Sequence, residues 1–161
     1  MSMKRILFVC TGNSCRSVMA KYLLEDLLRK SGVDDITVDS AGVFALEGLP
    51  ATQETKQVLQ QAGLDCSGHF ARGLTTGVVE SADLILAMEP LHVEEILRRM
   101  PSAKGKVHLL KRYGLDPQEA LQGSEHIPDP IAKPLEVYEV CFATIREAVE
   151  RVARSLGVNC P

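Results

Sequence analysis

The sequence predicts an α/β protein in which a four-stranded parallel sheet lies between two layers of helices. Short apolar segments alternate along the chain with segments whose apolar residues repeat at helical spacing. Strands that alternate with helices pair in parallel through right-handed crossovers, which place helices on both faces of the sheet. At 161 residues without repeats or linkers, we expect a single domain, 1–161, that buries a core without disulfide or metal support.

Short apolar runs predict the four strands. The first run, Ile6 to Val9, stops at Cys10, and the second is closed by Ala41 and Gly42. The third has a continuous apolar centre, as expected for a strand that is covered on both faces, and the fourth is short. In chain order the strands are expected at 6–9, 35–40, 83–88 and 106–110.

Helical spacing and stop signals predict the helices. The first helix ends at Gly32, the second at Gly63, and Pro101 halts the third. Pro134 suits the first turn of the last helix. Residues 114–134 contain four prolines, which predicts a long loop with a functional role. The helices are expected at 17–30, 52–62, 91–100 and from 134 onward.

The composition is that of a globular protein and argues against several kinds of partner. The net charge of −3 disfavours general binding to nucleic acid or to a membrane surface. No segment approaches the roughly 18 consecutive apolar residues of a membrane span, and the chain starts without a signal-peptide pattern. The histidines are scattered and the cysteines, odd in number, lack metal-binding spacing. We therefore expect no metal, and free thiols in a reducing cytoplasm.

The most informative segment is residues 4–17, where the first strand meets the first helix. Cys10 and Arg16 lie six positions apart and enclose small polar residues, so the loop can wrap one tetrahedral anion. Backbone N–H groups of such a loop and the helix N-terminus favour negative charge on a phosphate and on a thiolate. Ligands of parallel sheets bind beyond the carboxyl ends of the strands, where Cys10 lies. The segment predicts a cysteine nucleophile that attacks phosphorus.

The same spacing occurs a second time, at Cys66 and Arg72. Cys66 follows a helix stop rather than a strand, and its loop carries bulky side chains where a phosphate needs bare backbone. The loop after Cys10 has small residues that tolerate unusual backbone angles. We therefore predict the phosphate-binding loop at Cys10, with the members Thr11, Gly12, Asn13, Ser14 and Cys15.

Residues 9–17, Val-Cys-Thr-Gly-Asn-Ser-Cys-Arg-Ser, resemble the phosphate-binding loop of the low-molecular-weight protein tyrosine phosphatases. Asp-Ser-Ala-Gly at 39–42, segments 67–72 and 82–88, and Asp-Pro at 129–130 occur in the order of that family. The resemblance covers almost the whole chain. It implies a three-layer fold with a four-stranded parallel sheet in the order 2-1-3-4 and a phosphate-binding loop between strand 1 and helix 1.

The resemblance also implies a reaction mechanism. Cys10 matches the nucleophile, Arg16 the residue that binds phosphate oxygens and stabilises the transition state, and Ser17 the hydroxyl that supports the thiolate. Asp129 matches the acid that protonates the leaving group and later activates water. By motif alone, Asp116 competes with it, because it also precedes a proline.

Further residues match positions with supporting roles. Asn13, Ser40 and His69 correspond to residues that brace the loop by hydrogen bonds. Cys15 lies inside the loop, so a reversible disulfide with Cys10 would protect the nucleophile from over-oxidation. A small buried residue without redox function is the alternative for Cys15.

The substrate is less sharply specified. Members that act on phosphotyrosine carry aromatic residues after the Asp-Pro pair, whereas Ile131 stands there in this chain, and Phe44 is the candidate for the opposite wall. Ser14 resembles the bacterial branch that dephosphorylates phosphoarginine, although that branch has threonine. We expect a phosphotyrosine phosphatase, with a protein arginine phosphatase as the alternative.

Two other classes share parts of the pattern. Thioredoxin-coupled arsenate reductases have the same loop, but they need two more cysteines after the third strand, and residues 87–100 contain none. A silent phospho-residue binding module would not need a nucleophile, an arginine and an acid together. We expect a monomeric enzyme without a cofactor that acts on phosphorylated protein.

Overall fold

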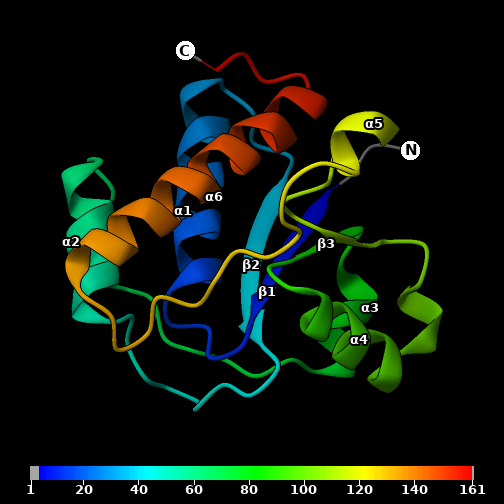
Figure 1. Ribbon diagram of the computed structural model, residues 1–161, viewed down its shortest axis with the longest axis horizontal. Helices are drawn as coiled ribbons and strands as arrows, with labels where there is room; N and C mark the ends of the chain where they lie inside the picture. Colours follow the sequence, from blue (N-terminus) through cyan, green and yellow to red (C-terminus); the bar gives the residue numbers. More distant parts are fainter. Residues whose placement is uncertain (1–3, 161) are drawn as a thin grey trace.

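Four parallel strands form one sheet in the order β2-β1-β3-β4, and β1 lies in its interior (Figure 1). This order and the helices on both faces, seen in a computed structural model that describes residues 4–160, confirm the predicted fold class. The strands are β1 (Arg5–Cys10), β2 (Thr37–Gly42), β3 (Leu84–Ala87) and β4 (Val107–Leu109). The α-helices are α1 (Arg16–Lys30), α2 (Gln53–Gln61), α3 (Thr76–Ser81), α4 (Pro90–Arg99), α5 (Pro117–Ala120) and α6 (Leu135–Ser155).

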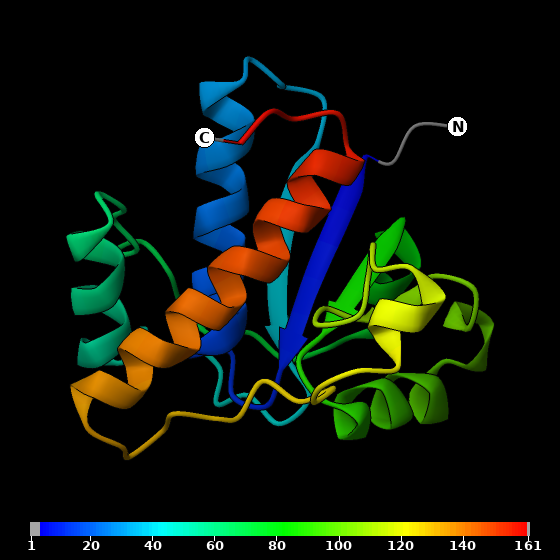
Figure 2. The ribbon, with the colours of Figure 1, turned by 45° about the horizontal axis from the view of Figure 1, so that its top comes forward.

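The helices pack on the two faces of the sheet (Figure 2). Successive side chains of a strand point to opposite faces. Ile6 and Phe8 therefore lie in the larger apolar cluster, together with side chains of α1, α2 and α6. Leu7 and Val9 lie in the smaller cluster with α3 and α4. Cys10 continues the first set, so β1 directs its side chain toward the face that α1 covers.

The predicted bounds of the second strand, 35–40, are wrong at both ends. The strand begins at Thr37 and ends at Gly42. In the sequence, Ala41 and Gly42 are typical of a turn that closes the strand. Ala41 and Gly42 nevertheless pair in register with Val9 and Cys10. The partner strand, rather than local propensity, sets where β2 ends.

Two short α-helices occur where the sequence predicts none, and a 3-10 helix, η1 (Pro101–Ala103), follows α4. α3 is capped by the side chain of Thr75, which accepts the N–H of Val78. α5 is a single turn inside the predicted loop 114–134, and Asp116 caps it by accepting the N–H of Glu119. Helices this short carry too few apolar repeats for a periodicity signal.

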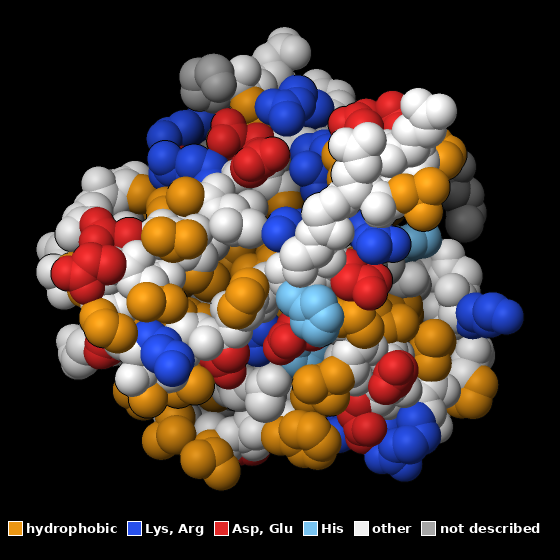
Figure 3. Space-filling model, viewed as in Figure 1, with side chains coloured by type: hydrophobic (Ala, Val, Ile, Leu, Met, Phe, Trp, Pro, Cys, Tyr) orange, Lys and Arg blue, Asp and Glu red, His pale blue; other side chains and the backbone are white. Residues whose placement is uncertain are grey.

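None of the helices within residues 4–160 is both long and apolar enough to cross a membrane. The same residues contain no group of three or more His, Cys, Asp or Glu side chains placed to hold a metal ion. Acidic and basic side chains are interspersed on the face seen in Figure 3, so that face offers no uniform basic surface.

Gly42 allows the loop after β1 to cross the end of β2. A Cβ atom at Gly42 would lie 2.5 Å from the carbonyl oxygen of Thr11 and 2.9 Å from the nitrogen of Asn13. These are backbone atoms, and the Thr11 oxygen is held by the N–H of Phe44 at 2.9 Å. The loop therefore cannot accept a methyl group at this position without moving.

We expect Gly42→Ala to lower the free energy of unfolding by about 1–3 kcal/mol, the usual cost of overpacking, and to lower activity with it. Gly77→Ala is the matched control, because a Cβ there meets nothing within 4 Å. Urea unfolding of both variants measures the difference. Equal stability of the two variants would contradict the crowding at Gly42.

Candidate active site

The loop from Thr11 to Cys15 joins the end of β1 to the start of α1. Cys15 is the N-cap of α1 but its side chain accepts no capping hydrogen bond, and the first turn contains no acidic residue. Within residues 4–160, the N–H groups of Gly12, Ser14 and Cys15 donate to no protein acceptor. Unused N–H groups at a helix N-terminus bind anions. The loop is therefore built to receive a tetrahedral anion.

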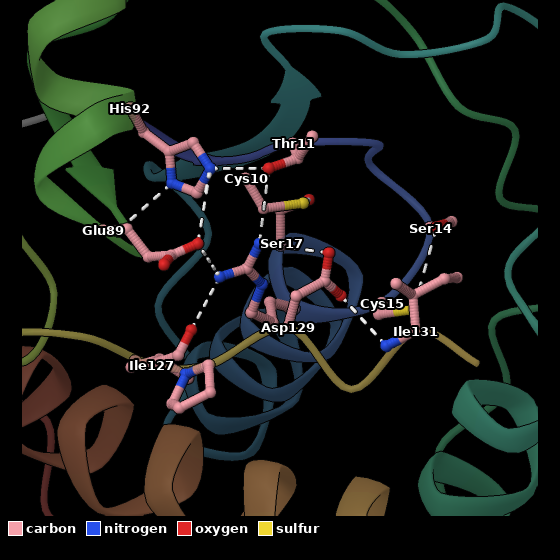
Figure 4. Close-up of polar contacts among 12 residues, drawn as sticks. Cys10, Thr11, Ser14, Cys15, Ser17, Glu89, His92, Ile127, Asp129 and Ile131 are labelled. Carbon is pink, nitrogen blue, oxygen red and sulfur yellow. Dashed lines mark hydrogen bonds and ion pairs between the residues drawn. The ribbon is translucent and has the colours of Figure 1, made fainter. Parts of the chain in front are cut away.

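The sulfur of Cys10 lies at the base of this loop (Figure 4). It is 3.0 Å from the hydroxyl oxygen of Ser17, and the backbone N–H of Asn13 donates to it at 3.3 Å. The side chain of Cys10 is buried. Ser17 is the second residue of α1 rather than its cap, so its hydroxyl is free to face the sulfur. An N–H and a hydroxyl directed at sulfur are the contacts that support a thiolate.

Asn13 is the centre of the hydrogen bonds that hold the loop. It adopts a left-handed conformation with φ of 54°, which asparagine tolerates better than most residues. Its side-chain amide donates to Ser17 at 2.8 Å and to Ser40 at 2.9 Å, and its side-chain oxygen accepts the N–H of Arg72 at 3.0 Å. His69 Nε2 donates to its carbonyl at 2.8 Å. The structure thus brings Asn13, Ser40 and His69 together around the loop.

His69 acts as a neutral donor in this arrangement. Burial lowers the pKa of its imidazole, although the hydrogen bond to the Asn13 carbonyl works in the opposite direction. A neutral ring that donates from Nε2 carries its proton there. His69 therefore fixes the loop without adding a charge beside it.

Arg16 is buried beneath the loop and held by groups that the sequence did not indicate. Its Nη1 donates to a carboxylate oxygen of Glu89 at 2.7 Å and to the carbonyl of Ile127 at 2.6 Å. Among the described residues, no acceptor contacts its Nε. Within residues 4–160, its Nη2 makes only long contacts, at 3.5 Å with the hydroxyl of Thr11 and at 3.6 Å with Asp129. The edge formed by Nε and Nη2 can therefore bind an anion with two parallel hydrogen bonds.

Glu89 belongs to the site by its contact with Arg16, and it is not among the residues predicted from the sequence. It is the second residue after β3, at the same edge of the sheet as Cys10. Partial burial opposes its ionisation, but the hydrogen bond and charge of Arg16 outweigh burial and lower the pKa of Glu89. A carboxylate just past the end of a parallel strand is a signal that could have identified it.

Asp129 lies on the other side of Arg16. One of its carboxylate oxygens is 3.6 Å from Nη2 of Arg16, and the other accepts the N–H of Ile131 at 3.1 Å. Its side chain is about one-third exposed, at 36%, so it reaches the mouth of the site. Asp116 instead caps α5, as described above. The structure therefore places Asp129 beside the arginine, and Asp116 in a capping position.

Phe44 and Ile131 expose apolar surface near the loop. Phe44 is 61% exposed and follows β2, and its N–H donates to the carbonyl of Thr11. The guanidinium of Arg99 lies 5.8 Å from the centre of its ring. Ile131 is 47% exposed and is tied to Asp129 by the hydrogen bond given above.

The remaining cysteines have different surroundings. The sulfur of Cys15 lies 3.6 Å from the hydroxyl of Thr52 and 3.7 Å from that of Tyr138, and it forms no disulfide. The predicted disulfide between Cys15 and Cys10 stays a prediction. Cys66 lies in the apolar core, where burial raises the pKa of its thiol, the opposite of what a nucleophile needs.

A cysteine at the end of a central parallel strand, an uncapped helix N-terminus and a buried arginine define the class of cysteine-dependent phosphatases. The chain belongs to the low molecular weight phosphotyrosine protein phosphatase family, whose family model matches residues 5–160. The resemblance found in the sequence is thereby confirmed.

Relatives with two different substrates are similar to this chain. A protein-arginine-phosphatase of Geobacillus stearothermophilus is 37% identical, over 94% of this chain and 95% of its own length. A probable low molecular weight protein-tyrosine-phosphatase, EpsP of Ralstonia solanacearum, is 39% identical, over 91% and 92%. A solved structure of the arginine phosphatase YwlE, in which a phosphorylated serine replaces the active-site cysteine, has a TM-score of 0.86 at 31% identity and covers 95% of each chain.

Proposed function

We propose that this chain removes phosphate from protein side chains, with phosphotyrosine as the preferred substrate, through a phosphocysteine at Cys10. The observation that carries the proposal is the position of the Cys10 sulfur. It lies at the uncapped N-terminus of α1 and contacts the hydroxyl of Ser17. Arg16 is held beneath the loop by its hydrogen bond to the carbonyl of Ile127. The phosphorylated serine at the cysteine position of the related arginine phosphatase supports a covalent intermediate at this place.

The first step transfers phosphate to Cys10. The thiolate attacks phosphorus, the S–P bond forms, and the bond from phosphorus to the leaving oxygen breaks. The loop N–H groups and the free edge of Arg16 bind the three remaining phosphate oxygens, whose charge is spread in the transition state. Asp129 gives its proton to the leaving oxygen.

The second step regenerates the enzyme. Asp129, now a carboxylate, takes a proton from water as that water attacks phosphorus and the S–P bond breaks. The electron pair returns to the sulfur of Cys10, where the Ser17 hydroxyl and the Asn13 N–H receive the thiolate. Phosphate then leaves the loop.

Asp129→Asn tests the proposed acid. We expect kcat/KM for phosphotyrosine to fall about 100-fold or more, because its phenolate leaves poorly without a proton. The loss for p-nitrophenyl phosphate is expected to be much smaller, because nitrophenolate is a good leaving group. Asp116→Asn is the matched control, with wild-type rates expected. An equal loss for both substrates, or a loss in Asp116→Asn instead, would reassign the acid.

The preference between phosphotyrosine and phosphoarginine rests on the surroundings of the loop. Phe44 and Ile131 offer apolar surface for a flat ring. Ser14, a small hydroxyl residue inside the loop, and the similarity to arginine phosphatases favour phosphoarginine as the second candidate.

A side-by-side comparison of rates decides between them. We expect wild-type kcat/KM to be higher for phosphotyrosine, and Ser14→Thr to shift the ratio toward phosphoarginine, because threonine is the residue of the arginine branch. Arsenate with a thioredoxin system is the third substrate, and no turnover is expected. Faster hydrolysis of phosphoarginine by the wild type would overturn the phosphotyrosine assignment.

We propose that the protein works in a reducing compartment. The five thiols, which are all free within the described residues, support a reducing compartment such as the cytoplasm. We propose that residues 1–161 act as one domain and as a monomer. Sedimentation at several protein concentrations tests the oligomeric state.

A further inference from the structure

His92 is wholly buried in the first turn of α4 and uses both ring nitrogens. Its Nδ1 accepts the backbone N–H of Glu89 at 3.1 Å, and its Nε2 lies 2.9 Å from the hydroxyl oxygen of Thr11. A neutral imidazole has one donor nitrogen and one acceptor nitrogen. Because Nδ1 accepts from an N–H, the proton lies on Nε2, and His92 donates to Thr11.

The hydroxyl of Thr11 connects this histidine to the arginine of the site. Nη2 of Arg16 donates to the same oxygen at 3.5 Å, while Nη1 binds the carboxylate of Glu89. These four residues, with Glu89 taking part through its backbone N–H as well as its carboxylate, form a closed set of contacts between the start of α4 and the phosphate-binding loop (Figure 4). His92 thus contacts the loop at its first residue, Thr11, whereas His69 contacts it at Asn13.

The charges around His92 keep its ring neutral. Burial, and then the charge of Arg16, lower the pKa of His92 to about 4, and the carboxylates of Glu89 and Asp129 only partly offset them. His126 also faces this group, through its contact with Glu89 at 3.3 Å. Protonation would remove the Nδ1 acceptor and place a second cation beside Arg16.

We propose that His92 is a positioning residue of the phosphatase reaction, which fixes the start of the loop and the orientation of Arg16 through the hydroxyl of Thr11. The proposal rests on the proposed function. It predicts that loss of the contact to Thr11 slows catalysis more than it weakens substrate binding, since Arg16 acts most strongly in the transition state.

Two substitutions separate the two hydrogen bonds of His92. The shorter side chain in His92→Asn can still accept the N–H of Glu89 but does not reach Thr11. The amide in His92→Gln reaches Thr11 but has no acceptor at the Nδ1 position. We expect His92→Asn to lower kcat about tenfold with little change in KM, and His92→Gln to lose much less activity although it loses a helix cap.

A double-mutant cycle with Thr11→Val tests whether Thr11 transmits the effect. In the Thr11→Val background, His92→Asn is expected to lower kcat no further. The same tenfold loss in that background, or a loss in His92→Gln that equals or exceeds that of His92→Asn, would overturn the proposal in favour of a structural role. If the wild type itself did not hydrolyse aryl phosphates, the proposed function would fail instead.

The pH dependence of stability gives a second readout. The unfolded chain binds a proton at the ordinary histidine pKa of 6.5, whereas folded His92 binds it only near pH 4. As pH falls from 6.5 to about 4, the unfolded state gains this proton first, so the folded protein loses stability. The urea midpoint of the wild type is therefore expected to fall more over this interval than that of His92→Gln. If the urea midpoints of the two proteins fell equally, the imidazole of His92 would take up its proton in the folded protein as readily as in the unfolded chain, which contradicts the proposal.

Discussion

Replacing Cys10 by serine is expected to lower kcat by roughly four orders of magnitude or more, as for removal of other catalytic nucleophiles. Serine has nearly the same shape, but its hydroxyl stays protonated at neutral pH and attacks phosphorus poorly. The N–H of Asn13 and the hydroxyl of Ser17 lie against the sulfur atom and suit a thiolate. Steady-state hydrolysis of p-nitrophenyl phosphate measures the effect.

Cys66→Ala is the matched control for Cys10→Ser. Cys66 has the same spacing to an arginine, but it is buried in the core. We expect Cys66→Ala to change the free energy of unfolding, whereas kcat of the folded fraction stays at the wild-type value. Calorimetric titration with phosphate shows whether Cys10→Ser still forms the anion site. Turnover above about one-hundredth of wild type in a folded Cys10→Ser protein would contradict the requirement for a thiolate at position 10.

Arg16→Lys is expected to lower kcat about 100- to 1000-fold although the positive charge is kept, which is the usual cost of losing a transition-state donor. A lysine has one ammonium group and cannot reach both Glu89 and Ile127 while it binds two phosphate oxygens. The effect is expected mainly in kcat, with a smaller change in the inhibition constant for phosphate, which binds as a ground-state ligand.

Arg98→Lys provides the control for this substitution. Arg98 is largely exposed on α4 and pairs with Glu95, so wild-type kinetics are expected. If Arg16→Lys retained most of the wild-type kcat, charge alone would suffice. The two parallel N–H groups of the guanidinium would then have no role in catalysis.

The sequence predicts the part of the site that is local. The strand, the loop and the helix that contain Cys10 and Arg16 are adjacent in the chain, and their small polar residues and apolar runs are readable without the fold. Asp129 is predicted only through the family resemblance, because its contact with Arg16 joins segments more than 100 residues apart in the chain.

The remaining parts of the site depend on tertiary packing. Glu89 and the carbonyl of Ile127 come from two separate segments. The register of β3 against β1 brings Glu89 to Arg16, and the hydrogen bond from the N–H of Ile127 to the carbonyl of Met88 holds Ile127 beside it. Gly42 looks like a turn residue in the sequence, whereas its function follows from the backbone that crosses it. The short helices α3 and α5 are fixed by the caps of Thr75 and Asp116 rather than by a repeating apolar pattern.

The most direct test is to trap the intermediate. Wild-type enzyme is mixed with an aryl phosphate, quenched within one turnover and digested, and the phosphorylated peptide is identified by mass spectrometry. We expect phosphate on the sulfur of Cys10 in the peptide that contains the loop, and a burst of phenol release that equals the amount of enzyme. Hydrolysis that proceeds with no phosphorylated peptide, or phosphate bound to a different residue, would contradict catalysis through Cys10.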